Sequence, residues 1–242
     1  PSATLSEPVA GAAMMPCAFI LAAGRGERMR PLTDAAPKPL LEAGGRPLID
    51  WQLERLAACG VRRVVINHAH LGEKLEAAVG DGSRWGLSVA WSREGEALET
   101  AGGIVKALPL LGPEPFILTS GDIWSEFDFS RLAAVAADIA RAPARRAAHL
   151  VLVDNPPFPP AGDMALAGGL VRREGPRLTY ANIGVFHPSL FAGIAAGTHL
   201  RLFPWAYRFV EEGRVTGERF AGAWDNIGTP AQLAQLDRRL SR

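Results

Sequence analysis

The sequence predicts a single α/β domain in which helices cover both faces of a mostly parallel sheet. Apolar segments typical of buried strands alternate with amphipathic segments typical of helices along most of the chain. The length of 242 residues suits one large domain, or one domain with a small lobe. The first apolar segment also runs directly into a glycine-containing loop, and in open α/β sheets ligands bind where strands end.

The first half of the chain contains four expected strands and three expected helices. Short apolar runs predict strands over 17–23, 63–67, 88–91 and 116–120. Amphipathic or glycine-led segments predict helices over 47–59, 71–79 and 102–111. Gly60 and Gly80 end the first two helices, as glycine commonly does. Asp122 follows the fourth strand, so its carboxylate is expected at the carboxyl edge of the sheet.

The second half of the chain begins with a helix and then changes in composition. Residues 129–146 predict a helix with a break at Pro143, and 149–153 predict a strand. A proline-dense loop and short strands in antiparallel hairpins follow, so residues roughly 154–188 are expected to form a lobe over one sheet edge. The expected elements after the lobe are helices over 190–212 and 230–240.

Composition excludes several classes of protein. A net charge of +1 leaves no cation excess for the many phosphates of a nucleic acid. Two cysteines, Cys17 and Cys59, lack metal-ligand spacing and suit reduced residues of a cytoplasmic protein. No apolar run reaches about 18 residues, so no membrane partner is expected. Residues 1–14 lack the pattern of a signal peptide and are expected to be a disordered leader before a single domain, 15–242.

The loop after the first strand has the features of an anion site. Gly24 and Gly26 allow close approach to the backbone, and successive N–H groups in such a loop bind anions. Arg28 and Lys38 add cations that suit a polyphosphate. A Walker A loop needs four residues between its glycines, and a dinucleotide fingerprint needs a third glycine where this chain has Met29. Both are therefore excluded, and an ordinary strand-to-helix turn is the alternative for the glycines alone.

Residues 24–40 resemble the signature of the sugar-1-phosphate nucleotidyltransferases, a GxGxR(M/L)xPLT loop followed by a KP(L/M) element. Stretches at 67–72, 80–87, 94–104 and 150–156 are similar to the small bacterial N-acetylmuramate-1-phosphate uridylyltransferases of cell-wall recycling. The resemblance extends over nearly the whole chain from about Met15. It implies the nucleotide-diphospho-sugar transferase fold, a Rossmann-like three-layer α/β/α sandwich with a small β-rich sugar-binding lobe.

The resemblance implies transfer of a nucleotidyl group from a nucleoside triphosphate, UTP, to a sugar-1-phosphate, N-acetylmuramic acid 1-phosphate, with release of pyrophosphate. The sugar phosphate attacks the α-phosphorus in line, so catalysis rests on positioning and charge stabilisation. Arg28 is expected to hold the β- and γ-phosphates, and Lys38 to neutralise the sugar phosphate and the α-phosphate. The expected nucleotide-binding residues are Leu21, Ala22, Ala23, Gly24, Gly26, Glu94, Thr100, Ala101 and Gly102.

Mg²⁺ is the expected cofactor. Asp122 offers a hard oxygen ligand, although an Asp that caps a turn is an even alternative when the residue is taken alone. The family carries a second ligand in a W-x-D-x-G-T element, and alignment on Trp224 puts Asn226 at that position. Asp225 falls one residue early, and successive strand residues point to opposite sides. We therefore expect Asn226 to be the ligand, with Asp225 as the alternative.

The family's sugar-binding strand is similar to residues 180–184. Asn182, with Tyr180 and Gly184, is expected to contact the sugar, and a polar residue in a hairpin strand is the alternative. Trp124 is expected to stack on sugar or base, or to be a core residue. The lactyl carboxylate of the sugar needs a cation, for which the candidates are Arg172, Arg173 and Arg177. His68 and His70 are expected to be structural.

Other functions stay open at this point. The same chemistry is compatible with mannose-1-phosphate and GTP, or with glucose-1-phosphate and dTTP. A glycosyltransferase is disfavoured because no Asp-x-Asp motif follows an expected strand. A catalytically silent nucleotide-binding regulator is supported only by the departure at Asn226. A monomer or a small homo-oligomer is expected.

Overall fold

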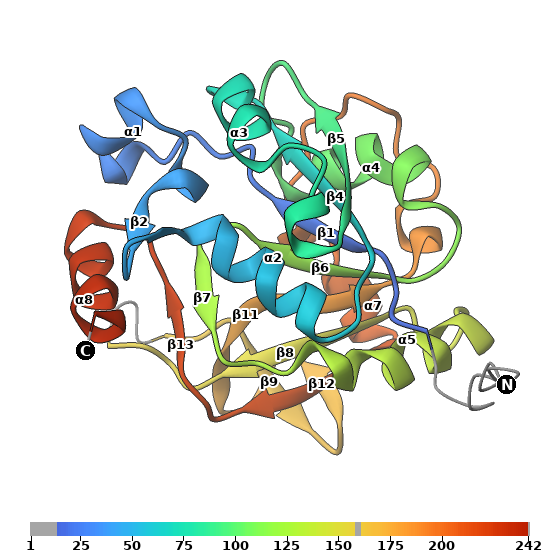
Figure 1. Ribbon diagram of the computed structural model, residues 1–242. Helices are drawn as coiled ribbons and strands as arrows, with labels where there is room; N and C mark the ends of the chain where they lie inside the picture. The colour runs from blue at the N-terminus through green and yellow to red at the C-terminus, as the bar shows by residue number, and fades with distance from the viewer. Residues whose placement is uncertain (1–13, 158–160, 242) are drawn as a thin grey trace, which may run out of the picture.

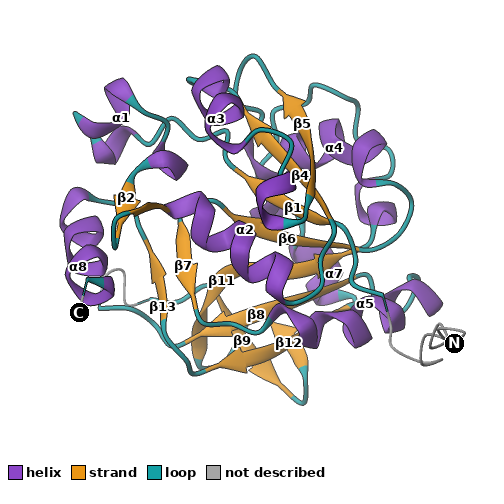
Figure 2. Ribbon diagram, viewed as in Figure 1, coloured by secondary structure: helices purple, strands orange, loops and turns teal. Residues whose placement is uncertain are grey.

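A nine-stranded mixed sheet forms the centre of the molecule, and helices cover both of its faces (Figure 1). The computed structural model describes residues 14–157 and 161–241, so the expected leader lies outside the described residues except for Met14. The strand order is β5-β4-β1-β6-β11-β8-β12-β10-β9. Figure 2 shows this sheet in orange with the purple helices arranged around it. The predicted α/β class is confirmed.

The element bounds agree with most of the expected ranges. The strands of the main sheet are β1 (Ala18–Leu21), β4 (Arg63–His68), β5 (Ser88–Arg93), β6 (Phe116–Ser120), β8 (Ala148–Val153), β9 (Met164–Ala167), β10 (Leu170–Arg172), β11 (Arg177–Phe186) and β12 (Val215–Phe220). Two small sheets pair β2 (Glu42–Ala43) with β3 (Arg46–Pro47), and β7 (Ile123–Ser125) with β13 (Trp224–Asn226). The helices are α1 (Leu32–Ala35), α2 (Leu48–Ala58), α3 (Gly72–Val79), α4 (Glu99–Leu111), α5 (Leu132–Arg141), α6 (Leu202–Trp205), α7 (Tyr207–Glu211) and α8 (Pro230–Leu240). None of the helices in the described ranges is long and apolar enough to cross a membrane.

The sheet is parallel in one half and mixed in the other. Strands β5, β4, β1 and β6 are parallel neighbours, with Phe19 of β1 opposite Val65 and Leu118. Strand β11 is antiparallel to both β6 and β8, whereas β12 is parallel to β8. Strands β9, β10 and β11 arise from the segment expected to form hairpins, and consecutive hairpin strands run antiparallel. All three belong to the main sheet, where β11 lies between β6 and β8 and where β10 and β9 form one edge.

Alternate residues of β1 face different layers, as the two-residue period of a strand requires. Ala18 and Ile20 belong to a core cluster that also contains buried residues of α2, α3 and α5. Phe19 belongs to a second cluster with residues of α4, α6 and α7. These two clusters make the three-layer arrangement. A third cluster around Met29 and Trp124 joins α8 to the small β7–β13 sheet.

The predicted extent of two helices was wrong. The helix over 129–146 is a 3-10 turn at Phe129–Arg131 followed by α5, which ends two residues before Pro143, because proline disfavours helical geometry in the residue before it. The continuous helix over 190–212 is replaced by a 3-10 turn at Pro188–Phe191 and the short helices α6 and α7. Gly193 and Gly197, both with positive φ, interrupt this segment.

Candidate active site

A cavity of about 650 Å³, here called the main cavity, opens where β1, β4 and β6 end. Its lining comprises Leu21, Ala22, Ala23, Gly24, Arg25, Gly26, Glu27, Arg28, Met29, Lys38, Pro39, Asn67, Glu94, Ala97, Glu99, Thr100, Ser120, Asp122, Asn182, His199 and Gly228. The expected catalytic residues and most of the expected nucleotide-binding residues therefore line one cavity. Its place at the carboxyl ends of parallel strands is the usual position for a ligand in an open α/β sheet.

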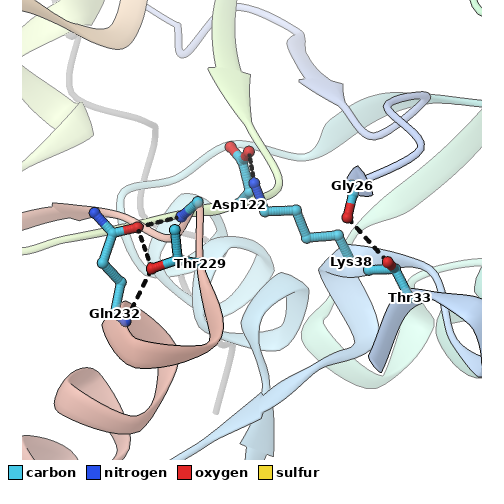
Figure 3. Close-up of polar contacts among 7 residues, drawn as sticks. Gly26, Thr33, Lys38, Asp122, Thr229 and Gln232 are labelled. Atoms are coloured by element: carbon cyan, nitrogen blue, oxygen red, sulfur yellow. Dashed lines mark hydrogen bonds and ion pairs between the residues drawn. The ribbon is translucent and has the colours of Figure 1, made fainter. Parts of the chain in front are cut away.

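The glycine loop is held open by one side-chain contact. The hydroxyl of Thr33 donates a hydrogen bond to the carbonyl of Gly26 over 2.9 Å (Figure 3). Gly26 has a φ of 64°, and a Cβ there would lie 2.9 Å from the Thr33 methyl carbon. Gly26 is therefore required by the turn. Around Gly24, no other described residue would come within 4 Å of an added Cβ, which leaves space for a ligand.

Lys38 and Asp122 form an ion pair at the cavity (Figure 3). The Lys38 Nζ lies 2.5 Å from the Asp122 Oδ2, and Lys38 is only 9% exposed. The other carboxylate oxygen of Asp122, Oδ1, is buried and has no hydrogen-bond partner among the described residues. A buried carboxylate oxygen without a partner is costly unless a ligand satisfies it. A hard oxygen of this kind fits Mg²⁺.

The expected second metal ligand, Asn226, is not among the residues that line the main cavity. Strand β13 pairs with β7 so that Asn226 lies opposite Ile123, and Ile227 donates a backbone hydrogen bond to the Asp122 carbonyl over 2.9 Å. Asn226 therefore lies next to the site without lining it. Asp225 does not line it either, and its carboxylate is paired with Arg239. Within the described ranges no cluster of three or more His, Cys, Asp or Glu residues is arranged to hold a metal ion.

The start of α8 positions Gly228 against Arg28. The Gln232 Oε1 accepts hydrogen bonds from the Gly228 N–H at 2.8 Å and the Thr229 hydroxyl at 3.2 Å (Figure 3). The Thr229 hydroxyl in turn accepts one from the Gln232 N–H, which completes a reciprocal helix cap. The Arg28 Nη2 lies 3.2 Å from the place of a Cβ on Gly228. Glycine here lets the guanidinium lie close to the backbone.

A buried amide and a buried carboxylate, both of which line the main cavity, connect three segments of the chain. The Ala22 N–H donates to the Asn67 Oδ1 at 2.7 Å, and the Asn67 Nδ2 donates to the Glu94 Oε1 at 2.5 Å. The Leu98 N–H donates to the Glu94 Oε2 at 2.9 Å. Burial raises the pKa of Glu94. Both oxygens of Glu94 therefore already accept hydrogen bonds from the protein. The sequence analysis did not identify Asn67 as a site residue. A polar residue near the end of an otherwise apolar strand was the feature that could have indicated it.

Several expected site residues lie in the protein interior rather than at the main cavity. Ala101 and Gly102 are buried in α4, where a Cβ on Gly102 would lie 2.1 Å from the Thr198 carbonyl oxygen. A Cβ on Gly184 would lie 2.6 Å from the His149 carbonyl oxygen. These glycines permit close packing of protein segments. None of the three lines the main cavity.

Trp124 and the three lobe arginines also lie away from the cavity. Trp124 is 4% exposed, and the guanidinium carbons of Arg55 and Arg239 lie 5.1 and 4.5 Å from its ring centroid. It belongs to the core, as its alternative interpretation held. Arg172, Arg173 and Arg177 line neither this cavity nor the smaller one described next, and Arg173 is paired with Glu211. We therefore do not retain these three arginines as candidates for binding the lactyl carboxylate.

A smaller cavity of about 210 Å³, here called the side pocket, adjoins the main cavity. Its lining comprises Leu21, Glu99, Thr100, Leu118, Tyr180, Asn182, Arg201, Leu202 and Phe203, of which four also line the main cavity. Asn182 has a φ of 55° and lies where the β11–β8 register shifts. Such strained positions often occur at binding sites. Sequence reasoning missed Arg201 and His199, because both belong to the segment that was expected to be helical.

Tyr180 supplies an unusual polar group to the side pocket. Its side chain is buried, and its hydroxyl has no hydrogen-bond partner among the described residues. Burial raises the pKa of Tyr180, so the hydroxyl stays protonated and is a donor.

The two histidines near the end of β4 make contacts within the protein. The His68 Nε2 lies 2.6 Å from the Glu76 Oε1, and its ring occupies the space that a side chain on Gly72 would need. Hydrogen bonds from Arg93 and His68 lower the pKa of Glu76. The His70 ring lies 3.3 Å from the Thr33 carbonyl oxygen. Neither histidine lines the main cavity.

Comparisons with known proteins place the chain among nucleotidyltransferases. The profile of the nucleotidyl transferase family matches residues 17–157. An N-acetylmuramate alpha-1-phosphate uridylyltransferase of Neisseria meningitidis serogroup B is 46% identical over 223 residues, which cover 90% of this chain and 95% of that protein. A protein of the same name from Caulobacter vibrioides is 36% identical and covers 93% and 96% of the two chains.

Solved structures share the fold at low sequence identity. HddC from Yersinia pseudotuberculosis superposes with a TM-score of 0.75 at 18% identity, over 93% of this chain and 99% of that chain. A structure from Bacillus anthracis superposes with a TM-score of 0.80, also at 18% identity, over 94% and 95% of the two chains. The three-layer fold expected from the sequence is confirmed by these structures.

Proposed function

We propose that this chain, which belongs to the nucleotidyl transferase family, transfers a uridylyl group from UTP to N-acetylmuramic acid 1-phosphate and releases pyrophosphate. The substrates are suggested by two relatives with this activity in their names, 46% and 36% identical over at least 90% of the chain. One observation carries the chemistry: the glycine loop, the cations Arg28 and Lys38, and Asp122, whose Oδ1 has no partner among the described residues, all line one cavity.

The proposed reaction joins two anions that repel each other, so the protein must hold both and balance their charge. Arg28, beside Gly228, is proposed to bind the β- and γ-phosphates through its planar guanidinium. Lys38, held at the cavity by Asp122, is proposed to donate hydrogen bonds to the α-phosphate and to the sugar phosphate. No protein nucleophile is needed, because a phosphate oxygen of the sugar phosphate forms the new bond to phosphorus and pyrophosphate leaves.

Asp122 is proposed to hold Mg²⁺ through its unpartnered oxygen, and phosphate and water would supply the remaining ligands. When bound, this ion supplies charge neutralisation on the triphosphate. The backbone of residues 22–26 and Thr100 are proposed to bind the nucleotide, and Asn182 and Tyr180 the sugar. We place the reaction in the cytoplasm, where nucleoside triphosphates are available.

The test is a pyrophosphate-release assay with Mg²⁺ that crosses UTP, dTTP, GTP and CTP with several sugar-1-phosphates. The parent is expected to prefer UTP with N-acetylmuramic acid 1-phosphate. Lys38→Ala and Asp122→Asn are each expected to lower kcat on the order of 10²–10³-fold. Lys106→Ala is the matched control, because Lys106 is exposed and lies outside the cavity.

Three results would contradict the proposal. If the parent prefers another pair of substrates, the proposed reaction class stands but the proposed substrates are wrong. If the Lys38→Ala variant is folded and releases pyrophosphate as fast as Lys106→Ala, Lys38 does not have the proposed catalytic role. Binding of UTP without pyrophosphate release from any pair would favour a silent regulator.

A further inference from the structure

The side pocket differs in its chemistry from the phosphate-facing loop of the main cavity. Its walls include the apolar side chains of Leu118, Leu202 and Phe203. The polar residues Glu99, Tyr180 and Arg201 also line it, and the Tyr180 hydroxyl is buried without a hydrogen-bond partner among the described residues. Asn182 lines both cavities, so a ligand in contact with Asn182 has access to the side pocket. The pocket therefore suits an apolar substituent that ends in a negatively charged acceptor.

Backbone contacts hold Arg201 at this pocket. The Leu200 N–H donates to the Leu98 carbonyl at 3.0 Å, and the Leu200 carbonyl accepts from the N–H groups of Ala101 and Gly102 at 2.9 and 3.1 Å. On the other side of Arg201, Leu202 is 4% exposed and begins α6. The main chain of Arg201 is thus fixed between two anchored residues, although its side chain is long and polar.

The Arg201 guanidinium is available to a ligand. Its Nε lies 3.5 Å from the Glu99 Oε1, and the Arg201 side chain is 74% exposed. An exposed ion pair at this distance contributes little free energy, so an incoming carboxylate can displace Glu99. A guanidinium binds a carboxylate through two parallel hydrogen bonds, which an ammonium cannot do.

The Tyr180 hydroxyl is an independent indication of a ligand. It is buried and has no partner within the described parts of the chain, and most buried polar groups in proteins are hydrogen-bonded. An acceptor oxygen of a ligand in the side pocket would satisfy it. Phe203 packs edge-on against the Tyr180 ring at 6.0 Å, which holds the ring in this position.

We propose that the side pocket receives the carboxylate-bearing substituent of the sugar phosphate, that Arg201 binds its carboxylate, and that the Tyr180 hydroxyl donates a second hydrogen bond. This proposal rests on the proposed function, because N-acetylmuramic acid differs from N-acetylglucosamine by a lactyl ether that ends in a carboxylate. Arg201 is then the residue that selects between the two sugars.

The experiment compares kcat/KM for N-acetylmuramic acid 1-phosphate with that for N-acetylglucosamine 1-phosphate in the parent and in variants. In Arg201→Gln the ratio of the two values is expected to fall about ten- to a hundredfold, mainly through KM, because a charged hydrogen bond is lost. Arg201→Lys is expected to restore part of the ratio. Arg177→Gln is the matched control, because Arg177 is exposed and lines neither cavity.

Tyr180→Phe tests the second donor without changing the shape of the pocket. We expect a several-fold fall in the same ratio and no loss of thermal stability, because the hydroxyl makes no hydrogen bond that the structure describes. A purely structural tyrosine would instead change stability and leave the ratio as in the parent.

The outcomes separate this proposal from the proposed function. If the parent uses N-acetylmuramic acid 1-phosphate but Arg201→Gln keeps the parental ratio, the assignment of Arg201 is overturned and the proposed function stands. An equal loss with both sugars also overturns it, because the contact would then not involve the carboxylate. A parent that turns over neither sugar phosphate contradicts the proposed function itself, and this proposal falls with it.

Discussion

Gly24 and Gly26 occupy the same loop but require glycine for different reasons. Gly26 adopts the left-handed region, and a Cβ there would contact Thr33. Gly24 does not have a left-handed φ, and apart from its two chain neighbours an added Cβ would meet no atom of a described residue within 4 Å. The fold therefore requires Gly26, whereas at Gly24 it leaves open space that the proposed nucleotide would occupy.

Substitution of the two glycines tests this difference. Gly24→Ala is expected to leave thermal stability unchanged or raise it by about 0.4–1 kcal/mol, because alanine restricts the unfolded chain. The same variant is expected to raise KM for UTP, since the methyl group occupies ligand space. Gly26→Ala is expected to lose about 1–3 kcal/mol of stability through backbone strain. Thermal unfolding and steady-state kinetics measure both effects, and an unchanged KM in Gly24→Ala would argue against the loop as the nucleotide site.

At the residue scale, a sequence motif identified the site better than it identified each contact. Arg28, Lys38 and Asp122 were expected at one site, and all of them line the main cavity. Gly102 and Gly184 stand in similar motifs but serve packing against protein carbonyls. A glycine in a motif marks close approach to the backbone, and only the fold shows whether a ligand or the protein makes that approach.

At the scale of elements, side chains of the parallel strands β8 and β12 make a polar contact with each other. The Nδ1 of His149 in β8 lies 2.8 Å from the hydroxyl oxygen of Thr216 in β12, and its Nε2 lies 3.5 Å from the Glu218 Oε1. Arg131 also pairs with Glu218. The nearby His149 ring and the charge of Arg131 lower the pKa of Glu218, against the opposing effect of burial. The ionised carboxylate therefore stabilises the folded chain.

Glu218→Gln tests this contribution through its pH dependence. Because the folded-state pKa lies below the unfolded value of about 4.3, the stabilisation is present above that value and is lost as pH falls through the folded pKa. We expect the variant to lose about 1–3 kcal/mol at neutral pH and to approach the parent in acid. Urea unfolding across this pH range measures the difference. Glu212→Gln is the surface control, and an equal deficit at every pH would contradict the assignment.

The segment 190–212 shows why an element cannot always be predicted from local spacing. Its apolar residues have helix-like spacing, but Gly193 and Gly197 adopt positive φ, and Leu200 pairs with the backbone of α4. Hydrogen bonds to a distant element therefore outweigh local helix propensity. The same break places His199 and Arg201 beside the cavities, which no local motif indicated.

At the scale of the whole molecule, the main cavity joins parts of the chain that are far apart in sequence. The first glycine loop, Asp122, Asn182 and Gly228 all line it. Alternation of strand and helix patterns was sufficient to predict the α/β class. The antiparallel course of β11 depended on pairing with β6 and β8, which local pattern does not encode. A ligand that contacts all of these segments must stabilise the fold as a unit.

Thermal unfolding with UTP tests this coupling and the proposed metal ligand together. UTP with Mg²⁺ at about a hundred times its dissociation constant adds about 2.7 kcal/mol, which raises Tm by roughly 5–11 °C for a domain of this size. UTP without Mg²⁺ is expected to raise Tm less. In Asp122→Asn the extra shift due to Mg²⁺ is expected to disappear, because the one remaining oxygen accepts from Lys38 and an NH2 group, which cannot bind a cation, replaces the unpartnered oxygen. The control variant Lys106→Ala is expected to keep the extra shift in Tm due to Mg²⁺. If Asp122→Asn kept the full Mg²⁺ increment, the ion would have to be held by other residues, and Asn226 and Asp225, on the strand beside Asp122, would be the next to substitute.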